Sequence, residues 1–177
     1  AFYDPNNKLQ SYFGRTNFTY DDKYIVSGIV RADGSSKFGT NNQYGIFPAV
    51  SVAWKMSKES FIPEIISDLK LRGGWGITGN QEFPAGAAST LVRPVEGTPT
   101  IINNGNADLK WEQTTQTNIG LDFGFMKNRL TGSVDVYNKI TTDPLLKVAV
   151  ADPALYPSKW SNLSNTEINS KGVELAL

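Results

Sequence analysis

The sequence of 177 residues contains no cysteine and no histidine. These absences exclude disulfides, thiolate or imidazole metal sites, Ser-His-Asp triads and cysteine nucleophiles. No apolar run reaches the roughly 18 residues that a membrane-spanning helix needs. Seventeen basic and seventeen acidic side chains cancel, and no segment is strongly basic, so the charge pattern argues against nucleic-acid binding. Any catalysis would have to rely on carboxylates, lysine, tyrosine, serine or threonine.

What the sequence does have is alternation of apolar and polar residues with a period of two, which indicates β-strands. The clearest case runs from 68 to 79, where Leu69 and Leu71 share one face and Lys70 and Arg72 the other. The same alternation predicts further strands at residues 9–20, 24–33, 46–56, 115–124 and 129–140, and the start of another at 172–177.

The links between these strands are alternately short and long. The short links are residues 21–23, 125–128 and 57–67, the last of which we expect to be a short helix with Ser57 as its N-cap. The long links are residues 34–45, 80–110 and 141–169. If consecutive strands run antiparallel, all short links lie at one end of the sheet and all long polar loops at the other.

Strand length favours a membrane barrel over a soluble sandwich. Strands that cross a bilayer need about 9 to 11 residues, whereas sandwich strands have about 5 to 6. Polar side chains on the opposite face suit a water-filled lumen and not a dry sandwich core. We expect these to face the lumen: Arg15, Asn17, Arg31, Lys70, Arg72, Asn118, Asp122, Asp135 and Lys139. The predicted fold class is all-β, an antiparallel transmembrane β-barrel segment of six to seven strands.

Several short motifs, spread in order along the chain, resemble one family. They include Tyr12-Phe13-Gly14-Arg15, Arg31-Ala32-Asp33-Gly34-Ser35-Ser36, Gly76-Ile77-Thr78-Gly79-Asn80, Asp108-Leu109-Lys110-Trp111-Glu112 and Lys171-Gly172-Val173-Glu174-Leu175. These motifs resemble the barrel of SusC/RagA-type TonB-dependent outer-membrane transporters.

This resemblance implies a barrel of about 22 strands with a plugged lumen, surrounded by the outer-membrane lipid of a Gram-negative, Bacteroidetes-like bacterium. It implies import of oligosaccharides or peptides with energy from TonB, under the lid of a SusD-like surface lipoprotein. It also implies no catalytic activity and no cofactor. Residues 1–177 would then be part of the barrel, with the plug domain and the remaining strands outside this sequence.

Two motifs invite an enzymatic interpretation. Gly74, Gly76 and Gly79 have the spacing of a dinucleotide fingerprint, but no apolar helical stripe follows them to present its N-terminus to a pyrophosphate. We interpret them as small inward positions of a barrel strand, or as places where the backbone of a plug domain approaches closely. Asp122 and Asp135 would suit the carboxylate pair of a glycosidase, but a solvated network of lumen charges explains them more simply.

Aromatic side chains on the long loops are candidates for contact with a substrate or a lid protein. They are Phe38, Tyr44, Phe83, Trp111, Tyr156 and Trp160. The alternative is that they pack loop against loop or form the upper aromatic girdle. The sequence leaves two other functions open, namely a secreted soluble β-sandwich that binds carbohydrate and an adhesin-like barrel without transport.

Overall fold

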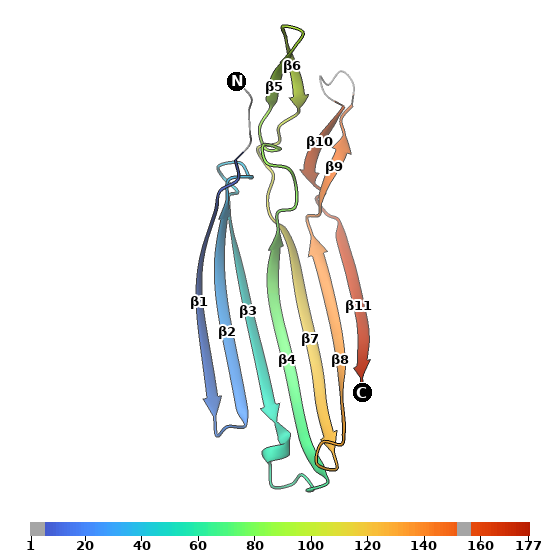
Figure 1. Cartoon of the computed structure of the whole chain (residues 1–177). Coiled ribbons are helices and arrows are strands. Elements are labelled where there is room, and N and C mark those ends of the chain that lie inside the picture. Colours follow the sequence, from blue (N-terminus) through green and yellow to red (C-terminus); the bar gives the residue numbers. More distant parts are fainter. Residues whose placement is uncertain (1–5, 152–156) are drawn as a thin grey trace.

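The computed structural model describes residues 6–151 and 157–177, and its main feature is one long antiparallel sheet (Figure 1). In spatial order its strands are β1 (Leu9–Tyr20), β2 (Tyr24–Ser35), β3 (Tyr44–Lys55), β4 (Ile66–Asn80), β7 (Glu112–Phe125), β8 (Leu130–Thr142) and β11 (Glu167–Ala176). All strands predicted from the alternation are present, so the all-β antiparallel prediction is confirmed.

Two hairpins rise from the long-loop end of this sheet (Figure 1). One pairs β5 (Leu91–Val95) with β6 (Thr98–Asn103), and the other pairs β9 (Leu145–Ala149) with β10 (Ser158–Asn162). The sequence analysis places both stretches in long loops. Positive φ angles at Glu96 and Gly97, +50° and +80°, close the first hairpin with the backbone twist typical of tight β-turns.

The helix expected at residues 57–67 is wrong. A single turn of 3-10 helix, Met56–Lys58, is followed by turns in which the N–H groups of Ile62 and Ile66 donate to the carbonyls of Glu59 and Pro63, three residues earlier in the chain. Pro63 has no N–H and disfavours helical backbone at the residue before it, so a regular helix cannot continue through this link. No helix within residues 6–151 and 157–177 is long and apolar enough to cross a membrane.

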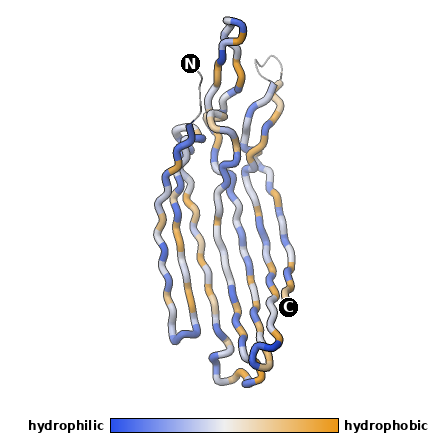
Figure 2. Tube along the Cα trace, viewed as in Figure 1, coloured by the Kyte–Doolittle hydropathy of each residue, from blue (hydrophilic) through white to orange (hydrophobic). Residues whose placement is uncertain are grey.

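The strand register decides which side chains share a face of the sheet. Val52, Gly73, Ile119, Val136 and Val173 lie opposite one another on five adjacent strands. This apolar face is open, with Ile119 60% and Val173 64% exposed, and Figure 2 shows hydrophobic and hydrophilic residues interleaved along each strand. Within the described residues no second sheet packs on this face, as a sandwich would require. Lipid is the natural cover for such a face.

Buried apolar side chains gather at the long-loop end of the sheet. We call this cluster the rim core, and its members among the described residues are Phe38, Phe47, Phe83, Ala87, Leu109, Trp111 and Leu145. They come from β3, from the start of β9 and from links far apart in the sequence. The rim core therefore joins loops that leave the sheet at different strands.

Candidate functional site

All nine polar residues expected to face a lumen lie on the face opposite the apolar one. The strand pairing places them in neighbouring rows across β1, β2, β4, β7 and β8: Arg15, Asn17, Arg31, Lys70, Arg72, Asn118, Asp122, Asp135 and Lys139. We call this surface the polar face. That it lines a water-filled lumen stays a prediction.

The best-organised group on the polar face is an arginine between two carboxylates. Arg72 donates from Nε and Nη2 to Asp122, at 2.9 and 2.7 Å, and from Nη2 to both oxygens of Asp135, at 3.0 and 3.1 Å. Lys70 lies 3.7 Å from Asp122 and adds a second cation. Each carboxylate is thus fixed by a cation, which favours a charge network over a catalytic pair that needs one protonated acid.

A glycine makes room for this network. Gly120 lies between Arg72 and Asp135 in the pairing of β4, β7 and β8. A Cβ atom at Gly120 would occupy the space of the Asp135 carboxylate and the Arg72 guanidinium. The sequence analysis does not single out Gly120, although its position opposite two charged residues of unlike sign is a usable signal once the register is known.

The rim core is built on aromatic contacts around Trp111. Its ring centroid lies 4.9 Å from that of Phe38 and 5.4 Å from that of Phe47, and its Nε1–H donates to the Gln43 carbonyl at 3.1 Å. A Cβ atom at Gly79 would overlap the Phe47 ring. Gly79 is therefore a packing glycine, in agreement with its interpretation as a small barrel position rather than part of a nucleotide loop.

An asparagine clasp holds the loops above the rim core. Asn162 Nδ2 donates to the carbonyls of Lys110 and Asp143, at 2.8 and 2.9 Å, while Asn162 Oδ1 accepts from the Lys110 N–H at 2.9 Å. These bonds join segments 52 and 19 residues apart in the sequence. The motif Asn162-Leu163-Ser164, which matches a glycosylation acceptor by chance, does not predict these contacts, because the partners of Asn162 are main-chain groups that only the folded loops bring near it.

The six loop aromatics predicted to contact a ligand do not form one surface. Phe38, Phe83 and Trp111 are at most 6% exposed within the rim core, which matches the loop-packing alternative. Trp160 is half-buried, with its ring 6.2 Å from that of Phe83. Tyr44 is 58% exposed but lies on the apolar face together with Ile46. This position suits the aromatic girdle that the sequence analysis gives as the alternative to ligand contact. Tyr156 lies outside the described residues. Direct ligand contact stays a prediction for all six.

The short-turn end carries a second polar cluster, around Glu59. Its carboxylate accepts hydrogen bonds from Trp54 Nε1 at 3.1 Å, Tyr24 Oη at 2.9 Å and Lys23 Nζ at 3.2 Å. The bond from Trp54, followed by that from Tyr24, lowers the pKa of Glu59 below its ordinary value. The cluster ties the link after β3 to the turn between β1 and β2, next to the stacked rings of Tyr24 and Trp54.

Comparison with known proteins gives related barrels. The curated relatives include TonB-dependent receptor SusC of Bacteroides thetaiotaomicron, 39% identical over 162 residues, which cover 84% of this chain and 16% of that protein. TonB-dependent receptor P39 of Formosa agariphila is 36% identical over 177 residues, which cover 96% of this chain and 17% of that protein. The chain therefore spans less than a fifth of the length of these relatives.

Solved structures support the same relationship. The RagAB peptide importer in its closed-closed state matches with a TM-score of 0.86 and 32% identity, over 94% of this chain and 19% of that one. The siderophore receptor PirA from Pseudomonas aeruginosa matches with a TM-score of 0.64 at 10% identity, which shows the fold alone. The family model described as TonB dependent receptor-like, beta-barrel, matches residues 1–177. The family model and the sequence similarity show that this chain belongs to the TonB-dependent receptor β-barrel family.

Proposed function

We propose that this chain is part of an outer-membrane importer that carries oligosaccharides or peptides into the periplasm. The observation that carries the proposal is the division of seven long strands into an apolar face and a polar face that holds all nine residues predicted to line a lumen. Within the described residues β1 and β11 each have one unpaired edge. Unpaired backbone in hydrocarbon costs several kcal/mol for each group, so the seven strands need neighbours. Residues 1–177 are then one part of a larger barrel, and its other strands and plug domain belong to chain outside this sequence.

The polar face would tune passage rather than carry out chemistry. The cations Arg72 and Lys70 balance the carboxylates of Asp122 and Asp135, so this part of the polar face has little net charge. Arg15 and Lys139, on the same face, offer cationic donors to a polar solute. Amide, hydroxyl and charged groups spread along a wet wall give a solute many weak contacts and no deep trap, which suits transport without catalysis.

The long-loop end would be the outer, substrate-receiving end. Outer-membrane barrels carry short turns on the periplasmic side and long loops outside. We propose that a SusD-like surface lipoprotein covers this end and that TonB supplies energy through the plug. The similarity to SusC and to RagAB supports this arrangement. The half-buried Trp160 and the undescribed Tyr156 remain our first candidates for contact with a substrate or with the lid.

Deletion of the whole gene tests import directly. A deletion strain grown on single oligosaccharides and on single peptide sources should lose growth on one nutrient class and keep it on the other. The class that fails identifies the substrate, and a plasmid copy of the gene should restore growth. Undiminished growth on every nutrient would contradict import and support an adhesin-like barrel. Affinity purification of the complete receptor should in addition recover one surface lipoprotein.

A further inference from the structure

A small hollow lies on the polar face beside Arg15 of β1. Its volume is about 170 Å³, and Arg15, Ser27, Ile29, Ala49 and Ser51 contribute to its lining. The strand register explains the hollow, because Arg15, Ile29 and Ala49 lie opposite one another, and Ser27 lies opposite Ser51 in the next row. Complete small-molecule sites have roughly 300–1,000 Å³. This hollow therefore has room for one unit of a longer solute and not for the whole solute.

No acidic side chain balances the charge of Arg15. Its Nε donates to Asn17 Oδ1 at 3.3 Å, and across residues 6–151 and 157–177 its guanidinium enters no ion pair. Arg31 lies in the row nearer the long loops and is paired with Asp33 at 2.7 Å. The hollow beside Arg15 is therefore a place of positive potential that attracts an anion.

An exposed aromatic ring stands close to this cation. Phe13 is two residues before Arg15 on the same face of β1, is 74% exposed, and has no ring contact with another aromatic side chain among the described residues. Side chains two residues apart on a strand are about 7 Å apart, roughly the size of one sugar unit. An aromatic ring can stack on the C–H face of a sugar, and a guanidinium binds a carboxylate through two parallel N–H donors.

Strand β8 carries a second pair of this kind. Lys139 lies in the same row as Arg15, across Ile29, Ala49, Gly76 and Gln116. Its Nζ lies 5.2 Å from the centroid of the Tyr137 ring, and within the described part of the chain it enters no ion pair. The sheet between the two pairs is low, since its β3 and β4 positions in this row are alanine and glycine. An anionic chain that moves along the polar face would meet a cation and an aromatic ring on both sides.

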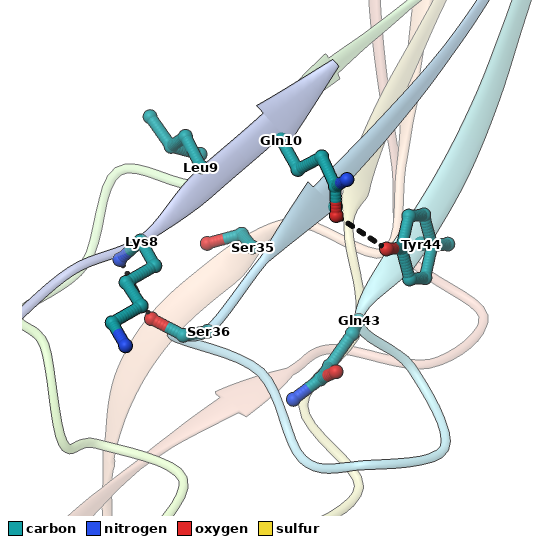
Figure 3. A pocket seen from close by; sticks show the side chains of 8 residues that line it. Lys8, Leu9, Gln10, Ser35, Ser36, Gln43 and Tyr44 are labelled. Atoms are coloured by element: carbon teal, nitrogen blue, oxygen red, sulfur yellow. Dashed lines mark hydrogen bonds between the residues drawn. The ribbon is translucent and has the colours of Figure 1, made fainter. Parts of the chain in front are cut away.

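A larger hollow beside Lys8 does not serve this purpose (Figure 3). Its volume is about 370 Å³, but Gln10 and Tyr44 in its lining belong to the row next to Tyr12 and Ile46 on the apolar face. Tyr44 Oη donates to Gln10 Oε1 at 3.0 Å, so these two groups already satisfy each other. A solute on the polar face meets Arg15 and not this pair.

We propose that the hollow beside Arg15 is a subsite for a carboxylate-bearing sugar unit, so that the imported solute is an acidic oligosaccharide that contains uronate. Arg15 pairs with the carboxylate, Phe13 stacks on the ring of the sugar, and Ser27 and Ser51 hydrogen-bond to its hydroxyls. Lys139 and Tyr137 offer a second contact to a unit farther along the chain. The inference rests on the proposed import function and names its substrate class.

The test measures the potential and the occupancy of the hollow in the complete receptor, purified in detergent, with any native cysteine replaced. Ser51→Cys places a reporter thiol in the hollow, and its reaction rates with an anionic and a cationic methanethiosulfonate are compared. Arg15→Gln should lower the ratio of the anionic to the cationic rate about threefold or more, because one nearby positive charge is lost. Lys147→Gln removes an exposed lysine of β9, away from the hollow, and should leave the ratio unchanged.

Protection of the same thiol identifies the ligand. Millimolar trigalacturonate should slow the reaction of Ser51→Cys, whereas maltotriose, a neutral sugar of equal length, should not. Arg15→Gln should abolish the protection, and Phe13→Ala should weaken it severalfold. Triglutamate should protect less well than trigalacturonate, because it has carboxylates but no sugar ring to stack on Phe13.

Four results would overturn the proposal. A thiol that reacts with neither reagent until the receptor is unfolded would mean that the plug covers the hollow. A rate ratio that Arg15→Gln does not change would remove the anion subsite. Equal protection by maltotriose would remove the role of the carboxylate, and equal protection by triglutamate would remove that of the sugar. Growth of the deletion strain reports import separately, so a receptor that passes the growth test and fails this one would overturn the acidic substrate alone.

Discussion

The seven long strands, which we call the wall, and the rim core are stabilised in different ways. Along the wall, Ile119, Val136 and Val173 are open on one face, and the strands are held to one another mainly by main-chain pairing. At the rim, Leu109 is fully buried and aromatic rings pack around Trp111. Lipid can cover the wall, but loops in water must make their own hydrophobic core. The comparison shows that apolar side chains are buried within the protein where water surrounds it, whether or not they belong to strands.

The largest expected effect is at the rim. Leu109→Ala removes a fully buried side chain and should destabilise the rim loops by about 2–5 kcal/mol, because it leaves a cavity. Hydrogen exchange of the loop amides measures this change. Leu146→Ala is the matched control, since Leu146 is 48% exposed beside the buried Leu145. Equal exchange in both variants would mean that the rim core does not hold the loops.

A charge on the apolar face tests the wall. Ile119→Arg should destabilise the folded barrel by about 2–4 kcal/mol, the cost of arginine on the lipid face near the bilayer midplane. Gln116→Arg places the same side chain on the polar face and should have little effect. Urea unfolding of the complete receptor in lipid vesicles measures both. If Gln116→Arg were the more harmful substitution, the assignment of the two faces would be reversed.

The charge network of the polar face should contribute less. Arg72→Met keeps an unbranched apolar stem and leaves Asp122 and Asp135 without their shared cation, at a cost of about 1 kcal/mol, the upper end for exposed pairs. Adding Asp135→Asn should recover part of this loss, because one of two neighbouring negative charges is removed. Arg15→Met serves as a control on the same face. A double variant less stable than Arg72→Met would rule out the shared guanidinium.

The smallest effect belongs to the Glu59 cluster at the short-turn end. Because the pKa of Glu59 is lowered in the folded state, its stabilising effect is complete above the ordinary glutamate pKa and is lost as pH falls through the folded value. Fluorescence of Trp54 and exchange of the turn amides should therefore change as the pH falls below the ordinary glutamate pKa of 4.5. Glu59→Gln should abolish this transition. If Glu59→Gln showed the same pH-dependent transition at the same midpoint pH, the transition would belong to another carboxyl group.

The wall was predictable from sequence because alternation reports faces directly. The strand predicted at residues 9–20 matches β1. The nine residues predicted to line a lumen all fall on the polar face, as the period of two requires. The alternation needs no partner strand to be recognised, since lipid and water impose it on each strand separately.

The rim was not predictable in the same way. The sequence allows Phe38, Phe83 and Trp111 either to contact a ligand or to pack loop against loop, and only the folded arrangement shows which residues they pack against. The hairpins β5–β6 and β9–β10 are short and lack a long alternating pattern. The helix at 57–67 failed because its apolar spacing was helical while Pro63 interrupts the hydrogen-bond ladder. Contacts between distant loops leave no local signal.

The central claim is that lipid covers the face carrying Ile119 while water covers the opposite face. These 177 residues contain no cysteine, so once any cysteine elsewhere in the complete receptor is replaced, single cysteines with spin labels can be placed at successive positions 116–123 of β7 and studied in vesicles. Collision with oxygen should peak at 117, 119, 121 and 123, and collision with a water-soluble nickel complex at 116, 118, 120 and 122. Peaks in the reverse order, or no alternation at all, would contradict the account.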